Sequence, residues 1–205
     1  MIAIVDYGAG NLFSLKSSFA AIGAETVVSG DADTIASAEK IVLPGVGAFG
    51  DAADKLRERG LDVLLQEEAG RGKPLLGICL GMQLLFSRSY EYGEHAGLSL
   101  IPGAVRSIDT LTHGTVKLPH IGWNRLHFPT DKPKSPLFRY IHEGDFVYFV
   151  HSFCAVECGD AVTAQTDYGE FLTAAVESGN VFGTQFHPEK SGDVGLSILR
   201  AFCEF

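Results

Sequence analysis

Cys79 lies in the segment Gly77–Gly81, which reads Gly-Ile-Cys-Leu-Gly and follows an apolar run that begins at Pro74. Glycines on both sides of a cysteine let a strand turn sharply into a helix and lift the side chain above the sheet edge. A helix starting at Leu80 directs unpaired N–H groups and its positive dipole end toward the sulfur. The alternative is a small buried apolar residue, the usual fate of a free cysteine. The pattern favours a nucleophile if other segments supply a base and an oxyanion hole.

A base and an orienting carboxylate are offered by His187-Pro188-Glu189, which directly follows an apolar stretch. Pro188 fixes a backbone dihedral between two titratable residues. Glu189 can bond one imidazole nitrogen and leave the other for the thiol. The alternative is an ordinary His-Pro turn capped by Glu189. The remaining histidines that we considered as the base lie in polar turns, loops or strands and have no shared role: His95, His113, His120, His127 and His142.

A third segment, Pro44–Gly47, reads Pro-Gly-Val-Gly and also follows an apolar strand. Glycines on both sides of Val46 make rotation of its peptide groups sterically cheap. A backbone amide of Val46 or Gly47 is one candidate oxyanion donor, and the Leu80 amide at the helix start is the other.

Strands and helices alternate through the first half of the chain. We predict strands at Ile2–Asp6, Glu25–Ser29, Lys40–Leu43 and Pro74–Ile78. The first predicted helix is capped by Asn11 and ends at Gly23. A second helical stretch follows Gly47 and runs to about Gly70 with a break near Gly60, and a third helix runs from Leu80 to about Arg88. Such alternation implies a mostly parallel sheet whose site lies beyond the carboxyl ends of the strands. The loops Tyr7–Asn11, Pro44–Gly47 and Cys79–Gly81 should therefore converge.

The second half has a different texture, with short strands separated by Gly, Pro, Asp and His. We predict them near Ala104–Ile108, Trp123–Phe128, Phe146–Val150, Ala161–Thr166, Leu172–Val176 and Asn180–Phe186, followed by a closing helix from Ser191 to Phe205. No repeat or linker divides the chain. The prediction is an α/β fold with a mostly parallel central sheet flanked by helices and an added antiparallel region, in one domain over 1–205.

Composition excludes several classes of function. The chain has 205 residues, is 46% hydrophobic and carries a net charge of −9, which opposes binding to a phosphate backbone. The longest apolar run, Leu75–Phe86, is too short to span a bilayer. Met1–Asp6 has no basic region of a signal peptide, so we expect a cytoplasmic protein with reduced cysteines. Cys154 and Cys158 lack a second ligand pair, and we expect no metal site.

A dinucleotide fingerprint is the other interpretation that the glycines invite, at Tyr7–Asn11. The third glycine of that pattern is missing, because Phe13 stands at its place. We reject this interpretation and expect no cofactor.

The chain resembles the class I (Cys-His-Glu) glutamine amidotransferases over its whole length. The two most specific signatures are Gly77–Gln83 and His187–Glu189. Further segments resemble the glutaminase subunits of imidazole glycerol phosphate synthases: Asp6–Asn11, Pro44–Phe49, Gly122–Asn124, Tyr148–Phe153 and Glu189–Ser191. Anthranilate synthase glutaminases usually carry His where this chain has Met82, and pyridoxal phosphate synthase glutaminases carry a different elbow.

The resemblance implies hydrolysis of L-glutamine by Cys79, His187 and Glu189, through a γ-glutamyl thioester. It implies that Gln83 and the backbone around Ser152 and Phe153 bind the substrate. It also implies that rotation of a peptide group in the Pro44–Gly47 loop gates activity.

The resemblance implies a partner as well, a (β/α)₈-barrel cyclase subunit that forms a heterodimer and receives the ammonia in histidine biosynthesis. Asn11, Trp123, Tyr148 and Lys190 match positions near that interface. Their ordinary alternatives are a helix cap, a buried aromatic, a strand tyrosine and a solvated lysine. Two other functions remain open, a stand-alone amide or γ-glutamyl hydrolase and a non-catalytic scaffold of the same fold.

Overall fold

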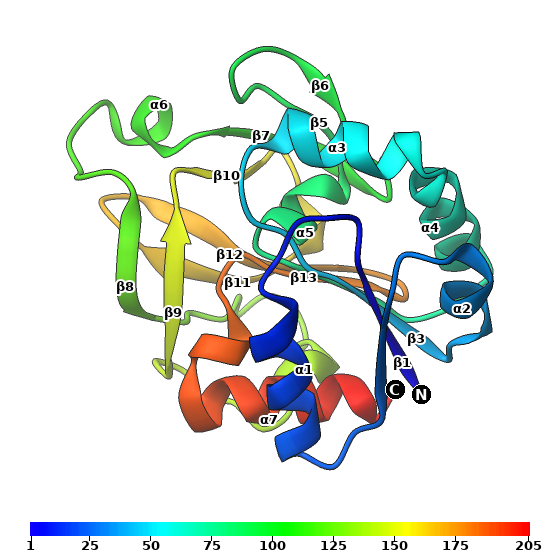
Figure 1. The fold of residues 1–205 in the computed structure, drawn as a ribbon. Coiled ribbons are helices and arrows are strands. Elements are labelled where there is room, and N and C mark those ends of the chain that lie inside the picture. The colour runs from blue at the N-terminus through cyan, green and yellow to red at the C-terminus, as the bar shows by residue number, and fades with distance from the viewer.

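A seven-stranded sheet forms the centre of the computed structural model, which describes residues 1–205 (Figure 1). In spatial order its strands are β11 (Val162–Asp167), β12 (Phe171–Ser178), β13 (Val181–Thr184), β4 (Leu75–Ile78), β3 (Lys40–Leu43), β1 (Ile2–Val5) and β2 (Thr26–Ser29). From β13 to β2 the strands are parallel, whereas β12 runs antiparallel to both β11 and β13. The predicted α/β fold with a mostly parallel sheet is confirmed.

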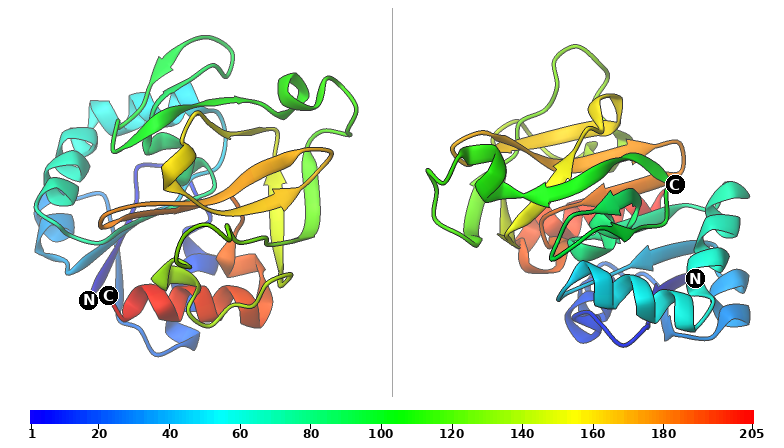
Figure 2. Two further views of the ribbon diagram at one scale, coloured as in Figure 1. Left: turned by 180° about the vertical axis from the view of Figure 1, so that it is seen from behind. Right: turned by 90° about the horizontal axis from the view of Figure 1, so that it is seen from above.

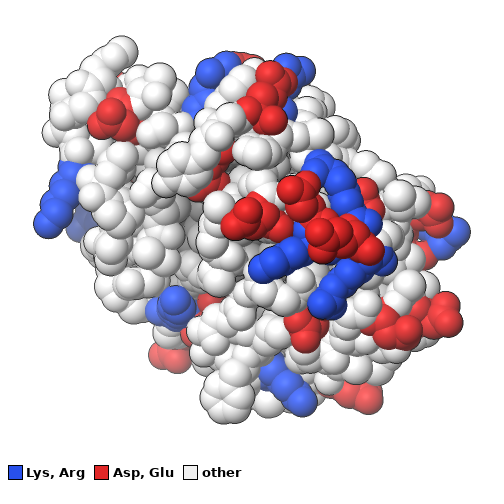
Figure 3. Space-filling view, turned by 45° about the horizontal axis from the view of Figure 1, so that its top comes forward, with Lys and Arg blue, Asp and Glu red and all other residues white.

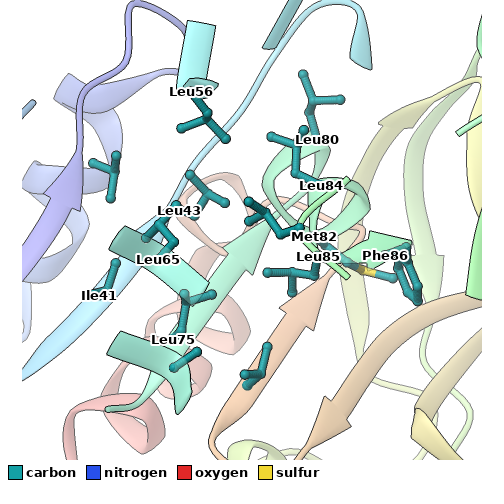
Figure 4. Packing of buried hydrophobic residues seen from close by; sticks show 14 of the residues in the cluster. Ile41, Leu43, Leu56, Leu65, Leu75, Leu80, Met82, Leu84, Leu85 and Phe86 are labelled. Carbon is teal, nitrogen blue, oxygen red and sulfur yellow. The ribbon is translucent and has the colours of Figure 1, made fainter. Parts of the chain in front are cut away.

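Helices cover both faces of this sheet (Figure 2). One face is covered by α2 (Ala32–Ser37), α3 (Phe49–Glu58) and α4 (Leu61–Gly70), and the other by α1 (Leu12–Ala21) and α7 (Gly192–Cys203). Side chains alternate along each strand, so Ala3 and Val5 enter the first core while Ile2 and Ile4 enter the second. Figure 4 shows part of the first core, where side chains of α3 and α4 meet those of β3 and β4.

Two smaller sheets flank the central one. The first has the order β10 (Phe153–Val156), β7 (Ile101–Ser107), β5 (Phe86–Ser89) and β6 (His95–Ala96). The second is an antiparallel ribbon of β8 (His120–Arg125) and β9 (Phe146–His151). The short helices are α5 (Leu80–Leu84) and α6 (Ile108–Thr112), with 3₁₀ turns η1 (Pro136–Phe138), η2 (Gly159–Ala161) and η3 (Pro188–Lys190). The predicted antiparallel region is thus present.

The structure corrects several predicted boundaries. The helix predicted from Leu80 to about Arg88 ends at Leu84, and Phe86–Ser89 forms β5 alongside β7. The last strand ends at Thr184 rather than Phe186. The predicted strand Trp123–Phe128 corresponds to β8, which begins at His120 and ends at Arg125. The sequence prediction also missed α2, α6, β6 and β10. The break near Gly60 is correct, since Gly60 adopts a left-handed conformation between α3 and α4.

All four cysteines are unpaired: Cys79, Cys154, Cys158 and Cys203. None of the helices combines enough length with enough apolar character to span a bilayer.

Candidate active site

Cys79 stands at the sharp turn between β4 and α5. It is the strained residue of the turn, with φ 55° and ψ −110°, a conformation that residues with a Cβ rarely adopt. The flanking glycines are needed for space rather than for unusual dihedrals. A Cβ on Gly77 would lie 2.6 Å from the Gly81 carbonyl oxygen, and one on Gly81 would lie 1.8 Å from the Leu43 carbonyl oxygen. Tight packing at both glycines therefore holds the cysteine in its strained conformation.

His187 and Glu189 lie beside this turn because β13 is parallel to β4 and ends at the same sheet edge. The two strands are joined beyond the ladder by the Cys79 amide, which donates to the Thr184 carbonyl oxygen at 2.7 Å. His187 Nδ1 lies 2.7 Å from Glu189 Oε1, and both side chains are almost fully buried. The structure thus brings together the three residues that the sequence predicts to be catalytic.

The electrostatic environment of His187 favours its charged form. Burial alone lowers the pKa of this imidazole, but the neighbouring Cys79 and Glu189 groups outweigh burial and raise the pKa to about 9. Nε2 of His187 is buried and has no hydrogen-bond partner, while Nδ1 is held by Glu189. The unpartnered nitrogen is therefore the one available for proton exchange with a thiol.

A cleft of about 470 Å³ opens over Cys79 and His187. Every residue that the sequence predicts to form the oxyanion hole or the substrate pocket lines it: Val46, Gly47, Leu80, Gln83, Ser152 and Phe153. Lys190, predicted for the partner interface, lines it as well. The geometry places backbone amides, a thiol and an imidazole around one space large enough for an amino acid.

The Pro44–Gly47 loop is anchored at one end and open at the other. The buried hydroxyl of Tyr7 donates to the Pro44 carbonyl oxygen at 2.9 Å, and burial followed by the nearby Cys79 charge raises the pKa of Tyr7. A Cβ on Gly45 would lie 2.8 Å from that hydroxyl oxygen. Val46 is 46% exposed, and Gly47 has φ +102°, which favours glycine.

Gln83 is held by neighbours on two sides. Its Nε2 donates to the Phe153 carbonyl oxygen at 3.0 Å and to Gln185 Oε1 at 3.1 Å. Both amide hydrogens are thereby used, so only Oε1 remains for a ligand. A substrate group that contacts Gln83 must consequently be a donor.

Several residues in the cleft or beside Cys79 were missed by sequence reasoning. Glu91 and Tyr92 line the cleft from the stretch after β5, for which the sequence analysis predicts neither an element nor a role. Glu91 Oε2 also accepts the Phe49 amide at 2.6 Å, at the start of α3. Gln185, fully buried, was read only as part of a strand. No short-range pattern marks these side chains, because their neighbours come from distant segments.

A buried histidine pair links the cleft to the β8–β9 ribbon. His151 lines the cleft, and its Nδ1 lies 2.9 Å from the Phe153 carbonyl oxygen. Its Nε2 lies 2.9 Å from His120 Nδ1, which must therefore carry the hydrogen. Burial lowers the pKa of His120 to about 4 and that of His151 to about 3, so both rings are neutral near pH 7. The prediction that His120 lies in a strand or loop is correct, but the sequence did not indicate its pairing.

Three of the four predicted interface residues form one cluster. Trp123 and Tyr148 contact edge to face across β8 and β9, with ring centroids 6.1 Å apart, and Lys190 Nζ lies 5.8 Å from the Tyr148 ring centre. Trp123 is 53% exposed, which excludes the buried alternative. Asn11 caps α1 by accepting the Ser14 amide at 3.4 Å, and α1 contacts η3.

Comparison with known proteins assigns this chain to a family. The sequence model of the glutamine amidotransferase class-I family matches residues 3–204. The chain belongs to the class-I glutamine amidotransferases. Among curated members of this family, the chain is 50% identical to the imidazole glycerol phosphate synthase subunit HisH of Sulfurimonas denitrificans, covering 100% of this chain and 98% of that protein. It is 48% identical to the HisH subunit of Aquifex aeolicus over 97% of this chain and 94% of that protein.

Solved structures of other amidotransferases share the fold. A crystal structure of a glutamine amidotransferase aligns with a TM-score of 0.76 at 18% identity, covering 100% of this chain and 98% of that one. The PurLQS structure from Thermotoga maritima includes a chain that aligns with a TM-score of 0.75 at 23% identity, over 99% of this chain and 97% of that one. These similarities extend over nearly the whole chain, including the segments that build the cleft.

Proposed function

We propose that this chain is the glutaminase subunit of an imidazole glycerol phosphate synthase, which hydrolyses L-glutamine to glutamate and ammonia. The observation that carries the proposal is the cleft itself, in which Cys79 faces the buried His187–Glu189 pair beside two segments rich in backbone amides. The full-length similarity to HisH proteins supports the choice of reaction. The helices pack on one central sheet, and we take 1–205 to be one domain that works in the reducing cytoplasm.

In the proposed reaction, His187 Nε2 takes the Cys79 proton and the thiolate attacks the side-chain amide carbon of glutamine. His187 then protonates the departing ammonia, and a water molecule cleaves the γ-glutamyl thioester to release glutamate. Glu189 holds the imidazole and stabilises its charged form through Nδ1. Negative charge on the tetrahedral oxygen is met by the Leu80 amide and by an amide of Val46 or Gly47, each worth on the order of 10²–10³ in rate.

The glutamine α-amino group fits the acidic side of the cleft. Glu91 lines this side and keeps one carboxylate oxygen beyond its bond to the Phe49 amide. Gln83 contributes Oε1, its only free polar atom. We assign the α-ammonium group to these two acceptors and the rest of the amino-acid end to the backbone around Ser152 and Phe153.

Rotation of a peptide group in the Pro44–Gly47 loop is our candidate for the switch. Tyr7 fixes the Pro44 carbonyl, while Val46 is exposed and Gly47 adopts a glycine conformation. A rotation of this peptide would bring a second amide to the oxyanion without moving the elbow.

The proposed partner is a cyclase subunit with a (β/α)₈ barrel, bound as a heterodimer. The cluster of Trp123, Tyr148 and Lys190 adjoins the cleft through Lys190, which lines it. Figure 3 shows charges of both signs gathered around α3, whereas the flank at its left, where β8 lies in Figure 1, carries few. Ammonia is protonated in neutral water and loses its nucleophilicity, so a covered path from Cys79 into the partner would keep it reactive.

The test measures glutamate release by this chain alone, with a cyclase subunit, and with the cyclase and its nucleotide ligand. We expect very low turnover alone and a strong rise in the complete mixture, which Cys79→Ala abolishes. Full activity of the isolated chain would favour a stand-alone hydrolase. Failure of a glutamine-analogue electrophile to label Cys79 would favour a non-catalytic scaffold.

A further inference from the structure

Gln185 is fully buried two residues before the proposed base, and its amide contacts the sulfur of Cys79. The distance from Gln185 Nε2 to Cys79 Sγ is 3.8 Å. The other polar contact of the sulfur is with the Val150 carbonyl oxygen at 4.0 Å, which can only accept the thiol hydrogen. A buried side-chain amide needs hydrogen-bond partners for its oxygen and for its nitrogen, and here one partner is the proposed nucleophile.

The orientation of this amide follows from its neighbours. The Phe153 carbonyl oxygen can only accept, so the atom of Gln83 facing it at 3.0 Å must be Nε2. The same Nε2 faces Gln185 at 3.1 Å, so the Gln185 atom there must be the oxygen. Reversing Gln185 would place two NH₂ groups against each other. The chain from Phe153 through Gln83 therefore requires that Gln185 present a donor to the sulfur.

We propose that Gln185 is a further catalytic residue, which donates a hydrogen bond to the Cys79 thiolate and stabilises it both as nucleophile and as leaving group. In the first step the thiolate forms the S–C bond and passes its charge to the carbonyl oxygen. In the last step, water attacks the thioester, the C–S bond breaks, and its electron pair returns to the sulfur beside Gln185 Nε2. Hydrogen bonds to ionised acceptors are about twice as strong as neutral ones, so the donor favours thiolate over thiol. This role rests on the proposed function, in which Cys79 is the nucleophile.

The experiment follows alkylation of Cys79 by iodoacetamide against pH in the full chain, with mass spectrometry to report each cysteine. In Gln185→Met we expect the alkylation midpoint of Cys79 to move up by about one pH unit, with roughly tenfold less thiolate below it. Cys203, which is partly exposed, serves as an internal reference whose curve should not change. Gln66→Met is the matched control, because that amide bonds the Leu98 carbonyl oxygen away from the cleft.

The measurement needs no glutamine, so it separates this proposal from the proposed reaction. Glutaminase activity together with an unchanged Cys79 curve in folded Gln185→Met would overturn the role of Gln185 and leave the reaction standing. A shifted curve in Gln185→Met, with no glutaminase activity of the unaltered chain in the complete mixture with cyclase and nucleotide, would support the hydrogen bond and reject glutamine as substrate. If Gln185→Met does not fold, the side-chain amide NMR signal of Gln185 in the unaltered chain decides. It should move as Cys79 titrates and be static in Cys79→Ala, and a signal that ignores Cys79 overturns the proposal.

Discussion

Each residue at the reacting centre has its hydrogen-bonding polarity set by a neighbour. Glu189 leaves Nε2 of His187 free, and the Phe153 carbonyl fixes Gln83, which in turn fixes Gln185. These buried side chains fix one another's orientation, so a single substitution alters protonation as well as packing.

The raised pKa of His187 predicts how stability depends on pH. The unfolded imidazole titrates near 6.5 and the native one near 9, so between these values the native state binds more protons. Stability should therefore be fully present below about pH 6.5 and fall as pH rises through about 9, by on the order of 1–3 kcal/mol. Urea unfolding of the unaltered chain and of His187→Gln between pH 6 and pH 10 tests this.

The variant should show a flatter profile over that range, and Cys79→Ala, which removes one source of the shift, should lie between the two. Identical profiles for the unaltered chain and His187→Gln would show that other groups cause the pH dependence.

Sequence reasoning succeeded at this scale only where a residue has local companions. Cys79 is marked by two adjacent glycines, and His187 by Pro188 and Glu189. Glu91 and Gln185 have no such companions, and their surroundings come from segments far apart in the sequence. Their place at the site could be found only from the fold.

At the scale of elements, the ends of β3 and β4 are packed against each other without spare room. Gly81 is the second residue of α5, and a Cβ there would overlap the Leu43 carbonyl at the end of β3. The turn that carries the nucleophile and the loop that faces it are consequently in contact through their backbones.

Gly81→Ala should therefore destabilise the protein strongly. Backbone atoms cannot move aside as a flexible side chain can, so we expect a loss of at least about 1–3 kcal/mol in unfolding free energy. Gly70→Ala is the matched control, since nothing lies within 4 Å of a Cβ at this helical, exposed position. It should be neutral or stabilising by up to about 1 kcal/mol. Equal urea midpoints for the two variants would contradict the packing described here.

Element boundaries were predicted correctly where a glycine interrupts the chain, and wrongly where apolar residues continue across the boundary. Gly60 correctly separates α3 from α4. The run from Leu84 to Phe86 is buried throughout, and burial of this kind suits a helix or a strand equally. The chain leaves the helix there because β7 offers Phe86–Ser89 a parallel partner, which local sequence does not reveal.

At the scale of the whole molecule, the β8–β9 ribbon connects an exposed surface to the cleft. Trp123 and Tyr148 stand on the ribbon, and the His120–His151 pair runs from it to the cleft wall. The neutral rings of this histidine pair thus connect the surface of the ribbon to the proposed substrate pocket.

Trp123→Ala should weaken binding to the proposed cyclase subunit by roughly tenfold or more, because exposed aromatic side chains often dominate such interfaces. Phe171→Ala is a suitable control, since Phe171 is similarly exposed, on β12. Calorimetric titration of each variant with the cyclase measures the effect. Equal affinities would remove Trp123 from the interface.

The anchoring of Pro44 and Gly45 has a consequence for how regulation could be observed. Tyr7 and the elbow hold these two residues, so any rearrangement of the loop must pivot after Gly45. The motion is then confined to a peptide unit or two, and the radius of gyration and the sheet remain as they are. Scattering and global spectroscopy of the complex should therefore report one unchanged particle with and without the nucleotide ligand. The state of the enzyme would be readable only from the amide signals of Val46 and Gly47.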